Sequence, residues 1–158
     1  MADVTIRRAT RDDLPDLLAF ILALVRETEQ RSLDPGVVAE GLIEALADPA
    51  HRAYWVATLP RPEGDGTQSV GCCLVTTEWS DWTGTWYWWF QSVYVLPEHR
   101  GREPGVWRHL YEAVCAEALR EGVHVVKLYV HETNGRAMKS YERLGMKPSP
   151  YRMYEASV

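Results

Sequence analysis

The sequence of 158 residues predicts one α/β domain, organised around a buried strand, a glycine-containing turn and a helix. Residues 86–96 form a run of aromatic and β-branched side chains, which favours a strand. The run is apolar on both faces, which is typical of a strand in the middle of a sheet. Pro97 ends it, and after Gly105 apolar residues recur every fourth position, as on one face of a helix. We therefore expect strand, turn and helix in this order between residues 86 and 121.

The first half of the chain predicts three further strands and two helices. Thr10 and Asp13 form a loose capping box at the start of the first helix, and Asp34 followed by Pro35 is the start signal of the second. A polar loop with prolines and glycines, residues 60–69, predicts a hairpin. The strands are expected at residues 4–8, 53–59 and 70–77, with residues 78–84 as a loop before the central strand.

The second half predicts a strand, a helix and a closing strand. Residues 123–130 are apolar and predict a buried strand. Asn134 is expected to cap the last helix, and Gly145 to end it. Residues 151–155 predict a short closing strand. With no repeat and no composition shift along the chain, residues 1–158 are expected to form a single domain.

Composition restricts the function classes. Hydrophobic residues make up 46% and charged residues 25%, which is ordinary for a globular protein. A net charge of −5, from 17 basic and 22 acidic residues, argues against nucleic acid as a partner. The sequence shows no signal peptide and no apolar stretch of about 18 residues, so we expect a cytoplasmic protein without a membrane span.

The three cysteines do not predict a metal site or a disulfide framework. Their number is odd, and their spacing fits no metal site. We interpret them as small buried residues in a reducing compartment. Cys72 and Cys73 are neighbours in a predicted strand, so their side chains should point to opposite faces.

The central strand, turn and helix predict an anion site. In this order, backbone N–H groups of the turn and the positive end of the helix dipole point to one spot. The expected ligand is a phosphate group. A simple strand–turn–helix connection without a ligand is the alternative, because glycine-containing turns are weak motifs.

Residues 93–102 (Val-Tyr-Val-Leu-Pro-Glu-His-Arg-Gly-Arg), followed by Gly105-Val106, resemble the pyrophosphate-binding motif of the GNAT family, the GCN5-related N-acetyltransferases. That motif, Arg/Gln-x-x-Gly-x-Gly/Ala, binds acetyl-CoA. When the helices are aligned, Gly105 takes the place of the first motif glycine and Trp107 that of the second. Residues 103–104 (Glu-Pro) are then a two-residue insertion, which removes one N–H and adds a negative charge.

A second segment, from Asn134 to Gly145, resembles the GNAT pattern Asn-x-x-Ala-x-x-x-Tyr-x-x-x-Gly. The resemblance implies that Asn134 and Ala137 lie along the cofactor, and that Tyr141 protonates the leaving thiolate. A thiol with a pKa of about 8.5 leaves more easily beside a phenol with a pKa of about 10. The alternative interpretation of Tyr141 is a packing residue on the inner face of a helix.

The resemblance also implies a gap between the central strand and the next one, in which the pantetheine arm bonds to the strand backbone. A backbone N–H near Val93 would polarise the acetyl carbonyl. The implied cofactor-binding residues are Val93, Tyr94, Val95, Arg100, Gly101, Arg102, Gly105, Val106, Trp107, Asn134 and Ala137.

In GNAT proteins the two early helices frame the acceptor side. Gln91 stands where some polyamine-acetylating members have a carboxylate, and an amide is no base at neutral pH. The base could be any of four residues, directly or through water: Glu78, Asp81, His131 or Glu132. The expected substrate residues are Glu78, Trp79, Asp81 and Gln91.

Together these observations predict an α/β protein of the GNAT type, with a mixed α+β sheet of six or seven strands, a central splay and about four helices. The expected function is N-acetyl transfer from acetyl-CoA to a primary amine of a small molecule or peptide, by direct attack in a ternary complex. The alternative is a catalytically silent CoA- or acyl-CoA-binding module. The resemblance also implies a homodimer, whereas the amine is left open among polyamines, amino acids, aminoglycosides and protein N-termini.

Overall fold

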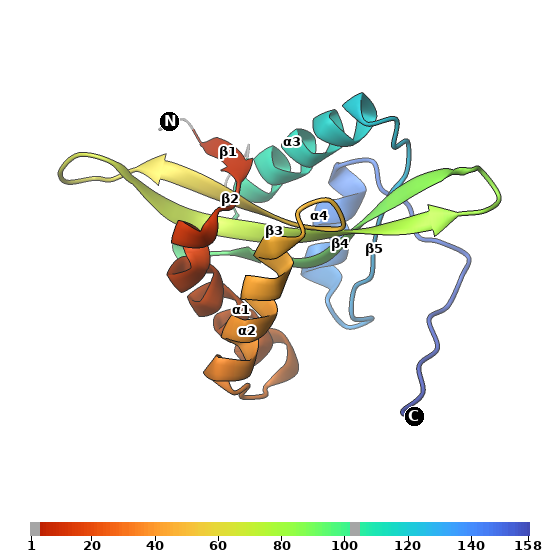
Figure 1. The fold of residues 1–158 in the computed structure, drawn as a ribbon, viewed down its shortest axis with the longest axis horizontal. Helices are drawn as coiled ribbons and strands as arrows, with labels where there is room; N and C mark the ends of the chain where they lie inside the picture. Colours follow the sequence, from red (N-terminus) through yellow and green to blue (C-terminus); the bar gives the residue numbers. More distant parts are fainter. Residues whose placement is uncertain (1–3, 102–104) are drawn as a thin grey trace. The chain divides into compact units, whose positions relative to one another are not determined.

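The computed structural model describes residues 4–101 and 105–158 (Figure 1). The chain divides into two compact units, one up to Leu128 and one from Tyr129 onward. The described part of the first unit contains five strands, three α-helices and two short 3₁₀ helices, and the second unit contains one α-helix. In chain order the elements are β1 (Thr5–Arg8), η1 (Arg11–Asp13), α1 (Leu14–Glu29), α2 (Pro35–Ala47), β2 (Arg52–Pro60), β3 (Thr67–Ser80), β4 (Thr85–Val95), η2 (Pro97–His99), α3 (Val106–Arg120), β5 (Val126–Leu128) and α4 (Gly135–Arg143).

The sheet of the first unit is mixed, as predicted. Its order is β1-β2-β3-β4-β5, with antiparallel pairs up to β4 and a parallel pair between β4 and β5. The described residues contain five strands, so the expected count of six or seven was too high. Residues 151–155 are exposed and form no strand, because a strand requires a neighbour for its backbone groups and none pairs with them among the described residues.

Helices cover both faces of the sheet (Figure 1): α1 and α2 lie on one face and α3 on the other. Under α3, Leu110 packs with Cys73 and Trp88 in one buried cluster. Under α1 and α2, Cys72 packs with Phe20 and other buried residues in a second cluster. The prediction that Cys72 and Cys73 point to opposite faces is therefore confirmed, and burial raises the pKa of both thiols, which keeps them protonated.

The predicted helix starts of the first unit are confirmed. The Asp34 carboxylate accepts hydrogen bonds from the N–H groups of Gly36 (2.7 Å) and Val37 (3.3 Å), as a helix N-cap does. At the other start, Asp13 accepts from the N–H of Thr10 (2.7 Å) and forms the capping box. Asp13 also accepts two hydrogen bonds from the Arg7 guanidinium, which lowers its pKa.

Two strands, β3 and β5, differ in length from the prediction. β3 continues to Ser80, so Glu78 and Trp79 lie in a strand and the loop is confined to the turn before Thr85. Gly84 has a positive φ of 62° there, and its N–H bonds to the carbonyl of Ser80 (2.8 Å), which closes the turn. β5 is shorter than expected, with three residues against residues 123–130. A strand is only as long as its pairing, which the sequence does not reveal.

The second unit contains α4 and the C-terminal segment. The Asn134 side chain accepts from the N–H of Ala137 (3.1 Å) and caps the helix, as predicted. At the other end Gly145 has a φ of 84°, and the N–H of Met146 bonds to the carbonyl of Tyr141 (3.2 Å). With the bond from Gly145 N–H to Glu142 (2.9 Å), this is the Schellman arrangement that stops a helix. Among the described residues of both units, no helix has the length and apolar character needed to cross a membrane.

Candidate active site

The second half of β4 has an open edge. The parallel pairing of β4 with β5 ends at Phe90 and Leu128. We call residues 91–95 the open edge of β4, and residues 92–95 of it pair with β3 on one side. Within the described part of the first unit, no strand pairs with them on the other side. The sequence-based expectation of a gap beside this strand agrees with this arrangement.

A β-bulge lies where the open edge begins. Leu74 of β3 pairs with Ser92, but Val75 pairs with Phe90, so Gln91 is the extra residue. A bulge bends its strand and re-aims the side chains around it. Gln91 Nε2 donates to Thr76 Oγ1 (2.8 Å), and Thr76 pairs with Trp89. The Gln91 side chain therefore lies on the same face of the sheet as Trp89.

Backbone alternation directs the polar groups of Val93 to the open edge. The N–H of Leu96 donates to the carbonyl of Val70, which precedes Gly71 in β3 (2.9 Å). Successive strand residues point their N–H and C=O groups to alternate sides, so those of Val93 and Val95 point away from β3. The carbonyl of Val95 accepts from Arg100 Nε (2.6 Å). The N–H of Val93 thus points to the open edge, and its role at the acetyl carbonyl stays a prediction.

The turn after β4 leads to a helix start without a side-chain cap. Gly101 has a φ of 75°, a left-handed conformation that favours glycine. Gly105 is the N-cap of α3 and offers no side-chain acceptor to the first-turn N–H groups. Such donors, together with the helix dipole, favour an anion. The predicted residue Arg102 and the Glu-Pro insertion lie outside the described residues.

The Arg100 side chain contacts Glu27 and Tyr94. Its guanidinium pairs with Glu27 of α1 (Nη1 to Oε2, 2.8 Å) and lies over the Tyr94 ring at 5.1 Å. The Tyr94 hydroxyl donates to the same carboxylate (3.0 Å), and Arg100 is the main cause of the lowered pKa of Glu27. Arg100 and Tyr94 therefore tie the turn to α1, and any role for them in cofactor binding stays a prediction.

Val106 and Trp107 attach the start of α3 to the sheet. Val106 is buried in the cluster under α3. The Trp107 ring meets Phe90 edge-on at 5.1 Å and lies 5.8 Å from the Tyr111 ring. Both side chains therefore hold the helix in place, and their contribution to cofactor binding would come from their backbone groups.

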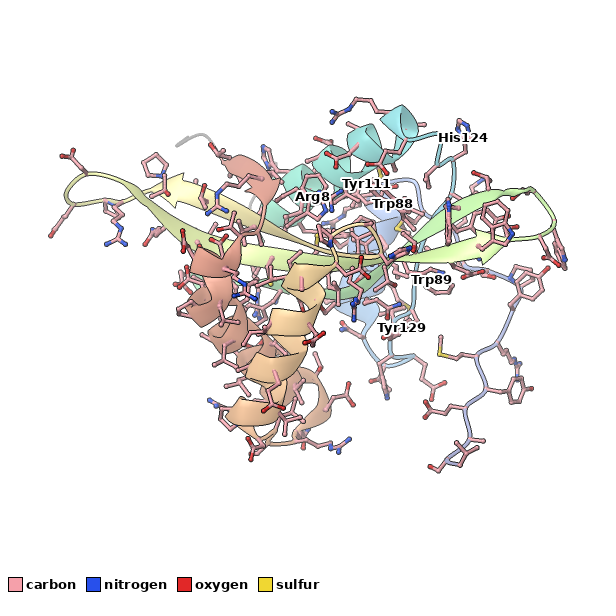
Figure 2. The ribbon with its side chains drawn as sticks, viewed as in Figure 1. Arg8, Trp88, Trp89, Tyr111, His124 and Tyr129 are labelled. Carbon is pink, nitrogen blue, oxygen red and sulfur yellow. The ribbon has the colours of Figure 1, made fainter. Side chains whose placement is uncertain are left out.

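Trp88 and Trp89 point to opposite faces, as expected for neighbours in a strand (Figure 2). Trp88 is buried under α3. Trp89 donates from Nε1 to the Glu78 carboxylate, which also accepts from Lys127 Nζ (3.1 Å). Lys127 was missing from the sequence prediction, because its place beside β4 depends on the pairing of β5.

The other predicted substrate residues lie at the end of the hairpin. Trp79 is 53% exposed and meets the Trp86 ring edge-on at 5.2 Å. Asp81 is exposed in the turn. Glu78 and Gln91 thus share the face of Trp89, whereas Trp79 and Asp81 are nearer the tip of the hairpin.

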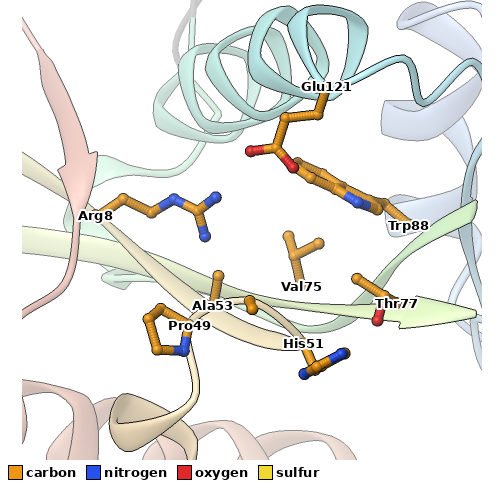
Figure 3. A pocket seen from close by; sticks show the side chains of 9 residues that line it. Arg8, Pro49, His51, Ala53, Val75, Thr77, Trp88 and Glu121 are labelled. Carbon is orange, nitrogen blue, oxygen red and sulfur yellow. The ribbon is translucent and has the colours of Figure 1, made fainter. Parts of the chain in front are cut away.

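A small cavity lies on the α3 face of the sheet, between Arg8 and Glu121 (Figure 3). Its volume of about 50 Å³ could hold roughly three or four waters, but no cofactor. Arg8 bonds to Glu117 (Nη2 to Oε1, 2.6 Å) and stacks over Trp55 at 4.4 Å. The cavity is too small for a cofactor and lies against the face of the sheet that α3 covers. We therefore do not count it as part of the open edge of β4.

Tyr141 lies in α4 of the second unit. Burial raises the pKa of its phenol, so it keeps its proton at neutral pH, as a general acid must. At the start of the same helix, the Ala137 N–H donates a hydrogen bond to the Asn134 side chain. The roles of these three residues at the cofactor stay predictions.

Comparisons with known proteins identify the family of this chain. Residues 18–146 match the description "Acetyltransferase (GNAT) family". The chain is 31% identical over 151 residues to a thialysine N-epsilon-acetyltransferase of Sus scrofa, covering 93% of this chain and 86% of the relative. It is 32% identical to the Bos taurus protein of the same name, covering 92% and 85%.

Solved structures show the same architecture. A possible acetyltransferase from Clostridium difficile 630 has a TM-score of 0.85 at 34% identity, covering 98% of this chain and 97% of that one. An aminoglycoside N-acetyltransferase in complex with CoA has a TM-score of 0.79 at 17% identity, with coverage of 99% and 96%, which supports the fold alone. The chain belongs to the GNAT family of N-acetyltransferases, enzymes that use acetyl-CoA.

Proposed function

We propose that this protein transfers the acetyl group of acetyl-CoA to a primary amine of a small molecule, by direct attack in a ternary complex. The observation that carries the proposal is the open edge of β4, with the Val93 N–H on it and an uncapped helix start after it. The relatives named thialysine N-epsilon-acetyltransferases, at 29–32% identity, favour an acceptor of the thialysine type, with an aminoalkyl side chain.

The residues present fit acetyl-CoA. The first turn of α3 and the Gly101 turn offer N–H donors for a pyrophosphate. The open edge of β4 offers backbone groups to an extended pantetheine arm. Bound there, acetyl-CoA supplies an activated acetyl thioester.

The chain's own groups would then act on the reaction in two ways. The N–H of Val93 donates to the oxygen on which negative charge develops. The Tyr141 hydroxyl, which burial keeps protonated at neutral pH, donates its proton to the leaving sulfur. Variants of Val93 and of Tyr141 test the two contributions separately.

The function is tested with purified protein, acetyl-CoA and a panel of amines: thialysine, lysine, spermidine, kanamycin and a short peptide. We expect thiol release with thialysine and lysine above the rate without amine, and calorimetric binding of acetyl-CoA alone. Binding without turnover on any amine would instead indicate the silent CoA-binding module. No binding at millimolar acetyl-CoA would contradict both.

We also propose a homodimer. The expected C-terminal strand is not formed, but the segment carries large exposed apolar side chains: Tyr151 is 75%, Met153 64% and Tyr154 89% exposed. Exposed apolar clusters of this kind mark interaction sites. Light scattering at micromolar concentration should give twice the mass of one chain, and removal of residues 150–158 should give one chain mass. A single-chain mass for the full protein would contradict the proposal.

A further inference from the structure

Three strands contribute to a cluster around the ammonium group of Lys127. Glu78 lies in β3, Tyr87 and Trp89 in β4, and Lys127 in β5. Lys127 Nζ is 3.1 Å from Glu78 Oε1, 4.2 Å from the centre of the Tyr87 ring and 5.1 Å from that of the Trp89 ring. A carboxylate and two ring faces therefore surround one cation.

Hydrogen bonding and strand pairing hold Glu78, Tyr87 and Trp89 in place, whereas the lysine side chain is flexible. The second oxygen of Glu78 accepts a hydrogen bond from Trp89 Nε1, which holds both the carboxylate and the indole. Glu78 and Tyr87 are directly paired across β3 and β4. The four-carbon stem of Lys127 is the flexible part, because lysine has several free torsions and a compact charge at its tip.

The cluster is accessible from solvent. The Lys127 side chain is 30% exposed and that of Glu78 is 43% exposed. A cation from solution can thus replace the lysine ammonium without unfolding the strands. Aromatic faces beside a carboxylate attract alkylammonium ions generally, through the ring quadrupole and the opposite charge.

The cluster also lies next to the open edge of β4. Lys127 pairs with Trp89, one position before the pairing of β4 and β5 ends at Phe90 and Leu128. The Gln91 side chain, at the bulge, lies on the same face.

We propose that Glu78, Tyr87 and Trp89 form a binding site for a primary alkylammonium group, which Lys127 fills until a ligand displaces it. Lys127 then acts as a tethered competitor, whose high effective concentration weakens binding of any free amine. The use of this site for the acceptor amine rests on the proposed function, whereas the binding of an alkylammonium ion does not.

The test removes the competitor. Lys127→Met keeps the length of the side chain and deletes its charge. n-Butylammonium chloride is titrated into parent and variant without acetyl-CoA, and the indole N–H signal of Trp89 is followed by NMR. We expect the variant to bind at least about fivefold more tightly than the parent.

Three controls make the result specific. Lys147→Met changes the net charge equally at an exposed position in the second unit, and should bind as the parent does. n-Butanol, which has the same chain without the charge, should leave the signal unchanged. Lys127→Met combined with Glu78→Gln should lose the gain. If Lys127→Met lowers the melting temperature strongly, Lys127→Gln is titrated in its place.

The proposal is overturned if Lys127→Met binds no more tightly than the parent, or if the added Glu78→Gln change leaves the gain intact. Failure of the proposed function gives a different pattern, in which n-butylammonium binds Lys127→Met but no amine is acetylated. If acetyl transfer occurs, Lys127→Met should also lower KM for the acceptor and leave KM for acetyl-CoA unchanged.

Discussion

Replacing Tyr141 with phenylalanine is expected to lower kcat by about 10²–10⁴-fold, the usual contribution of a general acid. The phenol carries a raised pKa because it is buried, so its proton is present throughout the neutral range. Phenylalanine keeps the ring but cannot protonate a leaving thiolate. Because the hydroxyl acts as charge develops on sulfur, the loss should appear in kcat, with little change in acetyl-CoA affinity.

The measurement compares steady-state kinetics on the best amine of the panel with calorimetric binding of acetyl-CoA. Tyr151→Phe is the matched control, since Tyr151 is exposed in the C-terminal segment and should keep the parental kcat. If Tyr141→Phe turns over within about twofold of the parent, below any general-acid effect of that size, Tyr141 is a packing residue.

Replacing Val93 with proline is expected to lower kcat by about 10²–10³-fold, as the loss of one oxyanion donor does. Proline has no N–H, and the Val93 N–H points to the open edge of β4, away from β3. The bonds that hold β4 to β3 are therefore kept, and proline is tolerated where the missing N–H faces an unpaired side of a strand.

Two further variants separate the N–H from the side chain and from the fold. Val93→Ala keeps the N–H and removes only methyl groups, so its kcat should stay near that of the parent. Tyr94→Pro removes an N–H that faces β3 and also removes a buried ring, so it should unfold the protein. Circular dichroism checks each fold. A folded Val93→Pro variant with parental kcat would show that another donor holds the oxygen.

The elements that the sequence predicted correctly depend on local patterns. Residues close together in the chain decide each of these features: the aromatic run of β4, the helix caps at Asp34 and Asn134, and the helix stop at Gly145. The opposite directions of Cys72 and Cys73 follow from strand geometry alone. The resemblance to GNAT motifs likewise depended on contiguous segments, and the family was confirmed.

The site depended on contacts between distant segments. Arg100 is held by Glu27, which also accepts from Tyr94, 67 positions away along the chain. Lys127 reaches Glu78 across 49 positions. The sequence predicted ligand roles for Arg100 and Glu78, which stay predictions, but it did not predict their contacts with Glu27 and Lys127.

Sequence alone therefore determined the type and order of most elements, the family and the position of the strand that carries Val93. Tertiary structure decided that β5 stops at Leu128, that a bulge lies at Gln91, and that Lys127 fills the cluster beside Glu78. The physical reason is register: a shift of one residue between paired strands reverses every side chain and every N–H. Register is set by the packing of the whole sheet, so no local pattern in the chain contains it.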